Sequence, residues 1–165
     1  MTMGRHAGSL VAIALLLLCG SEQGHAAVTF TCKVTATGIS FGTYNPLSTT
    51  AAESTGTYSV TCTATGTGSA TVAGTLSMSA GSSGKFSTRT LVSGTNALNY
   101  NIYATQSYGQ VLGDGTAGTY QESASGTVTA GQAYVVGGSF YGMIPVGQEV
   151  APGSYSDTIV VTVAY

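Results

Sequence analysis

The sequence predicts an all-β protein, an antiparallel β-sandwich of immunoglobulin-like type. Three observations lead to this fold class. After the first 26 residues, Gly, Ser, Thr and Ala dominate, and the strong helix formers Leu, Glu, Lys, Gln and Arg are scarce. Thr, Val and Tyr are abundant, and these residues suit a pleated, half-buried surface. Short runs with apolar residues at every second position are separated by Gly, Pro and Asn turn signals at short intervals, which is typical of sandwiches.

Two runs show the period-two alternation most clearly. In each, apolar side chains fall on one face and polar ones on the other, so each run predicts a strand with one buried face. The apolar sets are Val28, Phe30, Cys32 and Val34, and then Tyr58, Val60 and Cys62. Further strands are expected near residues 70–79, 85–92, 98–104, 120–128, 133–141 and 154–165.

The two cysteines in these runs, Cys32 and Cys62, predict one disulfide. Both lie on the apolar face of their strand, and a cysteine pair in an exported protein is typically oxidised. The alternative, half of a metal site, lacks a histidine to complete it, because both histidines fall in the first 26 residues.

The first 26 residues predict a secretory signal peptide, with one mature domain over residues 27–165. Arg5 supplies a positive charge and Leu10 to Leu18 form an apolar run too short to span a bilayer. Small residues at Gly24 and Ala26 suit cleavage after Ala26. The alternatives are a buried N-terminal helix, and lipidation at Cys19, which the bulky Leu18 before it disfavours.

The charge inventory excludes two classes of partner. The mature part keeps only Lys33, Lys85 and Arg89 as basic residues, and the whole chain has a net charge of −2. Such a surface cannot neutralise a phosphate backbone, so no nucleic-acid binding is expected. Binding to an anionic membrane is disfavoured for the same reason, and no later segment is apolar enough to be transmembrane.

No catalytic, cofactor-binding or metal-binding residues are predicted, and we expect that the protein is not an enzyme. Without histidine, serine and cysteine triads lose their usual base. The segment Gly81 to Lys85 fails the phosphate-loop pattern and is expected to be a hairpin loop, and the Ser82/Lys85 spacing lacks a helix to present it. Asp114 has no neighbouring acids for calcium and is expected to be a turn residue.

Five segments, in order, resemble a known family. They are TGISFGTY at 37–44, LNYNIY at 98–103, GDGT at 113–116, YGMIPVGQ at 141–148, and PGSYSDT at 152–158. They are similar to the spore coat protein U domain, which is found in subunits of archaic chaperone–usher pili, and the resemblance spans residues 28–165.

The resemblance implies an incomplete immunoglobulin-like sandwich that lacks its last strand. A groove would run along the apolar final run, lined by Ile159, Val161, Val163 and Tyr165, and no strand follows Tyr165 in the sequence to close it. In such pilins a periplasmic chaperone lends a strand to the groove. The N-terminal extension of the next pilus subunit then replaces it at the outer-membrane usher. The implied location is the periplasm and then the cell surface.

One departure concerns the donor extension. Strand donation needs about ten residues with alternating apolar side chains before the first strand, and only Ala27 to Thr31 separate the expected cleavage site from Cys32. We therefore expect a subunit that accepts a strand without donating one, either as a terminal or minor subunit of a polymer or outside pili altogether. The alternative function is a stand-alone secreted module that binds a surface or a carbohydrate.

Overall fold

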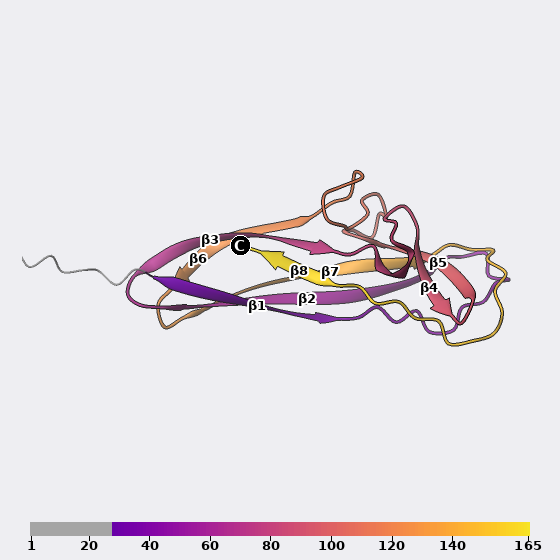
Figure 1. The fold of residues 1–165 in the computed structure, drawn as a ribbon, viewed down its shortest axis with the longest axis horizontal. Coiled ribbons are helices and arrows are strands. Elements are labelled where there is room, and N and C mark those ends of the chain that lie inside the picture. The colour runs from indigo at the N-terminus through magenta and orange to yellow at the C-terminus, as the bar shows by residue number, and fades with distance from the viewer. Residues whose placement is uncertain (1–27) are drawn as a thin grey trace, which may run out of the picture.

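The structure is a computed structural model that describes residues 28–165, so the predicted signal peptide lies outside the described residues. Two antiparallel sheets stack into an elongated sandwich (Figure 1). The five-stranded sheet has the order β1 (Thr29–Thr37), β2 (Ala52–Thr65), β7 (Ala133–Ile144), β5 (Asn96–Tyr103), β4 (Arg89–Ser93). The three-stranded sheet has the order β6 (Glu122–Thr129), β3 (Ser69–Met78), β8 (Val161–Ala164).

The predicted fold class is confirmed: the described chain is an all-β antiparallel sandwich with one disulfide. The disulfide joins Cys32 and Cys62, which are direct partners in the β1–β2 register. It therefore fastens two neighbouring strands of one sheet and does not tie the two sheets together. Its loop of 30 residues still restricts the unfolded chain.

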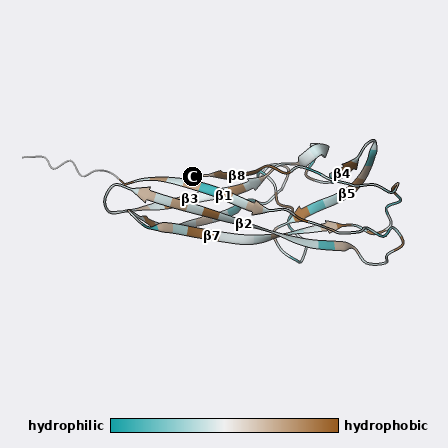
Figure 2. Ribbon diagram, turned by 90° about the horizontal axis from the view of Figure 1, so that it is seen from below, coloured by the Kyte–Doolittle hydropathy of each residue, from teal (hydrophilic) through white to brown (hydrophobic). Residues whose placement is uncertain are grey.

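The core between the sheets follows from the alternation in the sequence, visible as brown bands along the strands (Figure 2). Buried side chains form two clusters. The first comprises Leu76, Met78, Leu98, Tyr100, Ile102, Leu112, Phe140 and Ile144. The second, beside the disulfide, comprises Val60, Cys62, Ala64, Val72 and Val128. A Cβ on Gly56 would overlap the Phe140 ring, so this glycine makes room for an aromatic side chain of the first cluster.

Two expectations were wrong in detail. The last strand, expected over 154–165, is β8 and covers only Val161–Ala164. Residues before it are held by other contacts: Ser156 exchanges two backbone hydrogen bonds with Val92, and Val160 accepts one from the Ser79 N–H. The Gly81–Gly84 segment is not a hairpin loop, because β3 and β4 belong to different sheets. It contains a short 3₁₀ turn, η1 (Gly81–Ser83), and carries the chain across the sandwich.

The long connections after β1 and after β7 lie at the same end of the molecule as β4 and β5 (Figure 1). Residues from these connections enclose a cavity of about 730 Å³, lined among others by Phe41, Tyr44, Leu98 and Tyr155. The opposite end consists of long strands and short turns. The groove described next lies along those long strands.

Candidate functional site

The candidate site is the gap between the edges of the two sheets at β1 and β8. Within residues 28–165, β1 pairs only with β2, and β8 pairs only with β3. The two edge strands nevertheless lie close to each other across the sandwich (Figure 1). Each therefore has one side that faces the gap.

The backbone of β1 directs hydrogen-bonding groups into this gap. The Cα atoms of Cys32 and Cys62 are 4.0 Å apart, the close spacing of a non-hydrogen-bonded antiparallel pair. In such a pair the N–H and C=O groups point away from the partner strand. Because the pattern alternates, the backbone groups of Val34 and Ala36 face the gap as well.

The backbone of β8 does the same from the opposite side. The Ser79 N–H donates to the Val160 carbonyl, whereas the N–H of Met78, the register partner of Val161, donates away from β8 to the Gly113 carbonyl. Alternation then directs the backbone groups of Val161 and Val163 away from β3 and into the gap. Two rows of donors and acceptors thus face each other.

The wall of the gap on the β8 side is apolar. Ile159, Val161 and Val163 are half-buried and pack against the core, whereas Val160, between them, is 59% exposed and points outward. A cavity of about 350 Å³ opens at one end of the gap, between the end of β1 and the start of β8. Its lining includes Ala36, Ile39, Ile102, Phe140, Ile159 and Val161. We call the whole gap, from this wide end to Tyr165, the groove.

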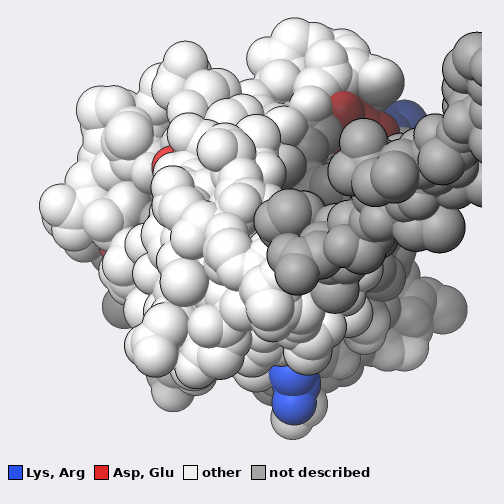
Figure 3. All heavy atoms as spheres, turned by 90° about the vertical axis from the view of Figure 1, so that its left-hand side faces the viewer, with Lys and Arg blue, Asp and Glu red and all other residues white. Residues whose placement is uncertain are grey.

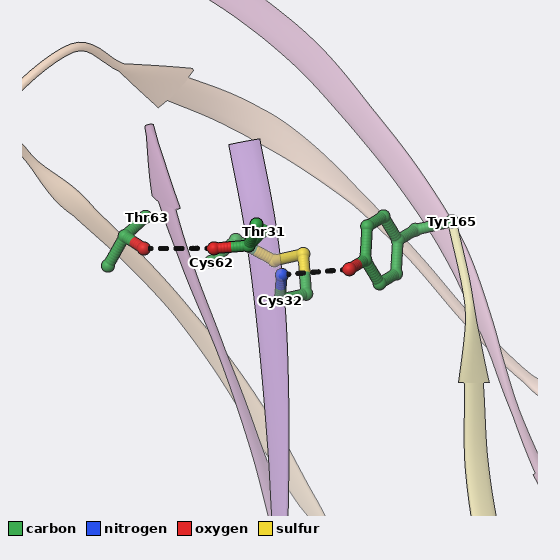
Figure 4. Close-up of a disulfide and its surroundings, with 5 residues drawn as sticks. All are labelled: Thr31, Cys32, Cys62, Thr63 and Tyr165. Carbon is green, nitrogen blue, oxygen red and sulfur yellow. Dashed lines mark hydrogen bonds between the residues drawn. A yellow bond between two sulfur atoms is a disulfide. The ribbon is translucent and has the colours of Figure 1, made fainter. Parts of the chain in front are cut away.

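The other end of the groove is narrow. The Tyr165 side chain crosses from β8 to β1, and the Cys32 N–H donates to its hydroxyl at 3.1 Å (Figure 4). Its ring also lies 5.8 Å, centroid to centroid, from that of Phe30. The cavity behind it, against the disulfide, measures only about 40 Å³. The structure therefore brings Ile159, Val161 and Val163 onto one wall, while Tyr165 spans the gap.

A buried polar cluster, absent from the sequence-based expectations, lies near the wide end. Arg89 is fully buried. Its guanidinium donates to the Ser79 and Leu112 carbonyls, and to the Asn101 Oδ1 at 2.6 Å. The Asn101 amide in turn donates to the Phe86 carbonyl. Burial lowers the pKa of Arg89. The LNYNIY segment provides Asn101, but nothing in the spacing of the sequence marked Arg89 as its partner.

Asp157 joins this cluster to the groove. Its carboxylate accepts hydrogen bonds from the Tyr100 hydroxyl at 2.8 Å and from the N–H and hydroxyl of Ser82. Burial opposes ionisation of Asp157, but these hydrogen bonds outweigh it and hold its pKa below the ordinary value. Burial and the Asp157 hydrogen bond raise the pKa of Tyr100. The PGSYSDT segment thus supplies a structural anchor immediately before the groove wall.

Two weaker candidates from the sequence, Ser82 and Asp114, have structural roles. The Ser82 hydroxyl donates to Asp157, so it takes part in the same anchor. Asp114 accepts hydrogen bonds from the N–H and hydroxyl of Thr116, which makes it a turn residue, as expected. In the described part of the chain no three His, Cys, Asp or Glu side chains gather where a metal ion would bind.

The surface is sparsely charged. On the end where β1 begins, the visible Lys, Arg, Asp and Glu side chains are few and scattered (Figure 3). Over residues 28–165 no helix has the length and apolar character needed to cross a membrane.

The comparison with protein families identifies the chain. The model of the spore coat protein U domain matches residues 20–162. The protein belongs to this family. The domain is associated with structural, pilus-type subunits and does not define an enzyme family. No curated protein matches the chain.

Proposed function

We propose that this protein is an exported structural subunit of a surface pilus that accepts a β-strand from a partner protein in its groove. The observation that carries the proposal is the pair of strand edges, β1 and β8. Their backbone groups face each other across a gap that has an apolar wall. A strand that adds to such an edge gains main-chain hydrogen bonds, and alternate side chains fill the pockets below. Membership of the spore coat protein U family supports this role.

The proposed occupants of the groove are, in turn, a strand of a periplasmic chaperone and a strand of the next subunit at the outer-membrane usher. The groove lining consists of Ile159, Val161 and Val163 on β8 and its approach, and the disulfide Cys32–Cys62 holds the opposite edge. The short segment before Cys32 supports a position at an end of the polymer or among its minor components. Residues 1–26 direct its export, residues 27–165 form the domain, and the protein catalyses no reaction.

A peptide of about ten residues with alternating valine and threonine tests the proposal. Because the peptide binds only the folded state, we expect an increase in melting temperature that grows with its concentration. Val161→Asp should abolish this increase, since a carboxylate would then be buried against the peptide without a partner. Val160→Asp is the matched control, because Val160 precedes Val161 directly and points outward.

Circular dichroism during heating measures both variants against the unmodified protein. Without peptide or chaperone, the protein should fold with low stability and tend to aggregate on heating, because an unpaired edge pairs indiscriminately. A protein that is stable alone, and whose melting temperature no peptide or chaperone changes, would contradict the proposal. A self-complete module that binds a surface or a carbohydrate would then be the better explanation.

A further inference from the structure

Tyr165 holds the two edges of the groove together at its narrow end. The other groove residues of β8, Val161 and Val163, project down onto the core, but the Tyr165 ring lies across the gap and reaches the β1 backbone (Figure 4). Its hydroxyl accepts the hydrogen bond of the Cys32 N–H, and its ring contacts Phe30. The contact joins residues 133 positions apart in the sequence.

The backbone of β3 accommodates this position of Tyr165. A Cβ on Gly74 would lie 2.9 Å from the Ala164 carbonyl oxygen and 3.4 Å from the Tyr165 Cβ. Any larger residue at this point would move the end of β8. Tyr165 remains 55% exposed, so its hydrophobic burial is incomplete and its side chain can leave without opening the core.

The hydrogen bond to Cys32 uses a group that an incoming strand needs. The Cys32 N–H points away from β2 and is one of the edge donors of β1. A strand that pairs with β1 along its full length must offer a carbonyl to this N–H. The Tyr165 hydroxyl and the incoming strand therefore compete for the same donor.

We infer that Tyr165 is a displaceable latch that closes the narrow end of the groove in the unoccupied subunit. This inference rests on the proposed function. The incoming strand enters at the wide end, beside Ala36 and Ile159, where the cavity of about 350 Å³ opens between β1 and β8. It then pairs progressively toward Cys32, and the last step is the displacement of the Tyr165 hydroxyl. The latch slows full occupation and protects the Cys32 edge from unspecific pairing.

Tyr165→Phe tests the latch, because it removes the hydroxyl and keeps the ring. In the protein without peptide, we expect amide hydrogen exchange at Cys32, followed by NMR, to become about fivefold faster, as befits the loss of one hydrogen bond. With the ten-residue valine–threonine peptide, we expect an association rate constant about fivefold higher and an unchanged dissociation rate constant. Tyr155→Phe is the matched control, since its hydroxyl bonds the Ala151 carbonyl outside the groove.

A shorter peptide, of four or five residues, sharpens the test. It can fill the wide end without reaching Cys32, so Tyr165→Phe should leave its association rate unchanged. Equal binding of the long peptide by the unmodified protein and the variant would overturn the latch and leave the proposed function intact. Absence of binding in both proteins, with Cys32 exchange unchanged by the substitution, would overturn both. Slower binding by Tyr165→Phe would show that the hydroxyl belongs to the acceptor surface, which also overturns the latch.

Discussion

The polar cluster around Arg89 and the groove beside it differ in how completely their polar groups are hydrogen-bonded. Near the wide end, Arg89 is fully buried, and its guanidinium donates hydrogen bonds to the Ser79 and Leu112 carbonyls and to the Asn101 Oδ1. Along the groove itself, the backbone groups of β1 and β8 face a gap that one tyrosine hydroxyl bridges. The polar cluster is complete within the described chain, whereas in the proposed function the groove is completed by a strand of another protein.

The physical reason for this difference is the cost of unpaired polar groups. A buried donor or acceptor without a partner is strongly unfavourable, so an internal cluster must be complete to be stable. The edge groups of β1 and β8 are reached by water in the unoccupied subunit, and that cost is small until a partner removes the water. The same principle therefore explains why the polar cluster is internally complete and why, in the proposed function, the strand edges of the groove can bind an added strand.

The largest effect is expected when the polar cluster is broken. Arg89→Met should lower the free energy of unfolding by about 3–5 kcal/mol, because the Ser79 and Leu112 carbonyls and Asn101 would remain buried without their donor. Urea denaturation, with and without the strand peptide, measures the loss. Lys33→Met is the control, since it removes one positive charge from an exposed position of β1 and should change stability by less than about 0.5 kcal/mol. Equal losses in the two variants would contradict the structural role of the cluster.

A smaller effect is expected from removing the disulfide that holds the β1 edge. Replacing Cys32 and Cys62 together by alanine should lower the free energy of unfolding by about 3.5 kcal/mol, from the loop-closure entropy of a 30-residue loop. The destabilisation should be greatest at the β1 edge of the groove, so amide hydrogen exchange should become faster in β1 more than in β5. Thiol labelling of the unreduced protein checks independently that Cys32 and Cys62 are bonded to each other. Quantitative labelling of both cysteines in the native state would contradict the bridge.

The strands that the sequence predicted best are those that alternate regularly. Phe30, Cys32 and Val34 fall in β1, and Tyr58, Val60 and Cys62 fall in β2. All of them have the expected inward faces, because a half-buried strand imposes a period of two. The last strand was predicted to be too long for the same reason. Alternation continues through Asp157 and Ile159, but side-chain bonds from Asp157 and Ser79 hold that stretch outside the β8 ladder.

The candidate site was predictable only in part. Ile159, Val161 and Val163 share a face in the sequence pattern, and the structure places them on one wall. The bridging position of Tyr165 was not predictable, because period two would direct it inward with Val163. The hydrogen-bond partners of Arg89, which are Ser79, Asn101 and Leu112, come from three separate segments of the chain, and no local spacing indicates such a cluster.

The smallest effect concerns the anchor between the two regions, Asp157. Hydrogen bonds from Ser82 and Tyr100 hold its pKa below the ordinary value despite burial. A carboxyl whose pKa is lower in the folded protein than in the unfolded chain stabilises the fold above the unfolded value, and this contribution disappears as the pH falls through the folded value. Asp157→Asn should therefore lower the free energy of unfolding at pH 7 by about 1–2 kcal/mol.

The difference between this variant and the unmodified protein should shrink as the pH falls below about 4, where the Asp157 carboxyl of the unfolded chain begins to bind its proton. Urea denaturation at a series of pH values measures the difference. Glu149→Gln, at an exposed position, is the control and should show little difference at any pH. A difference for Asp157→Asn that stays constant from pH 7 to pH 3 would mean that the charge of Asp157 plays no part, and that the anchor depends on its shape alone.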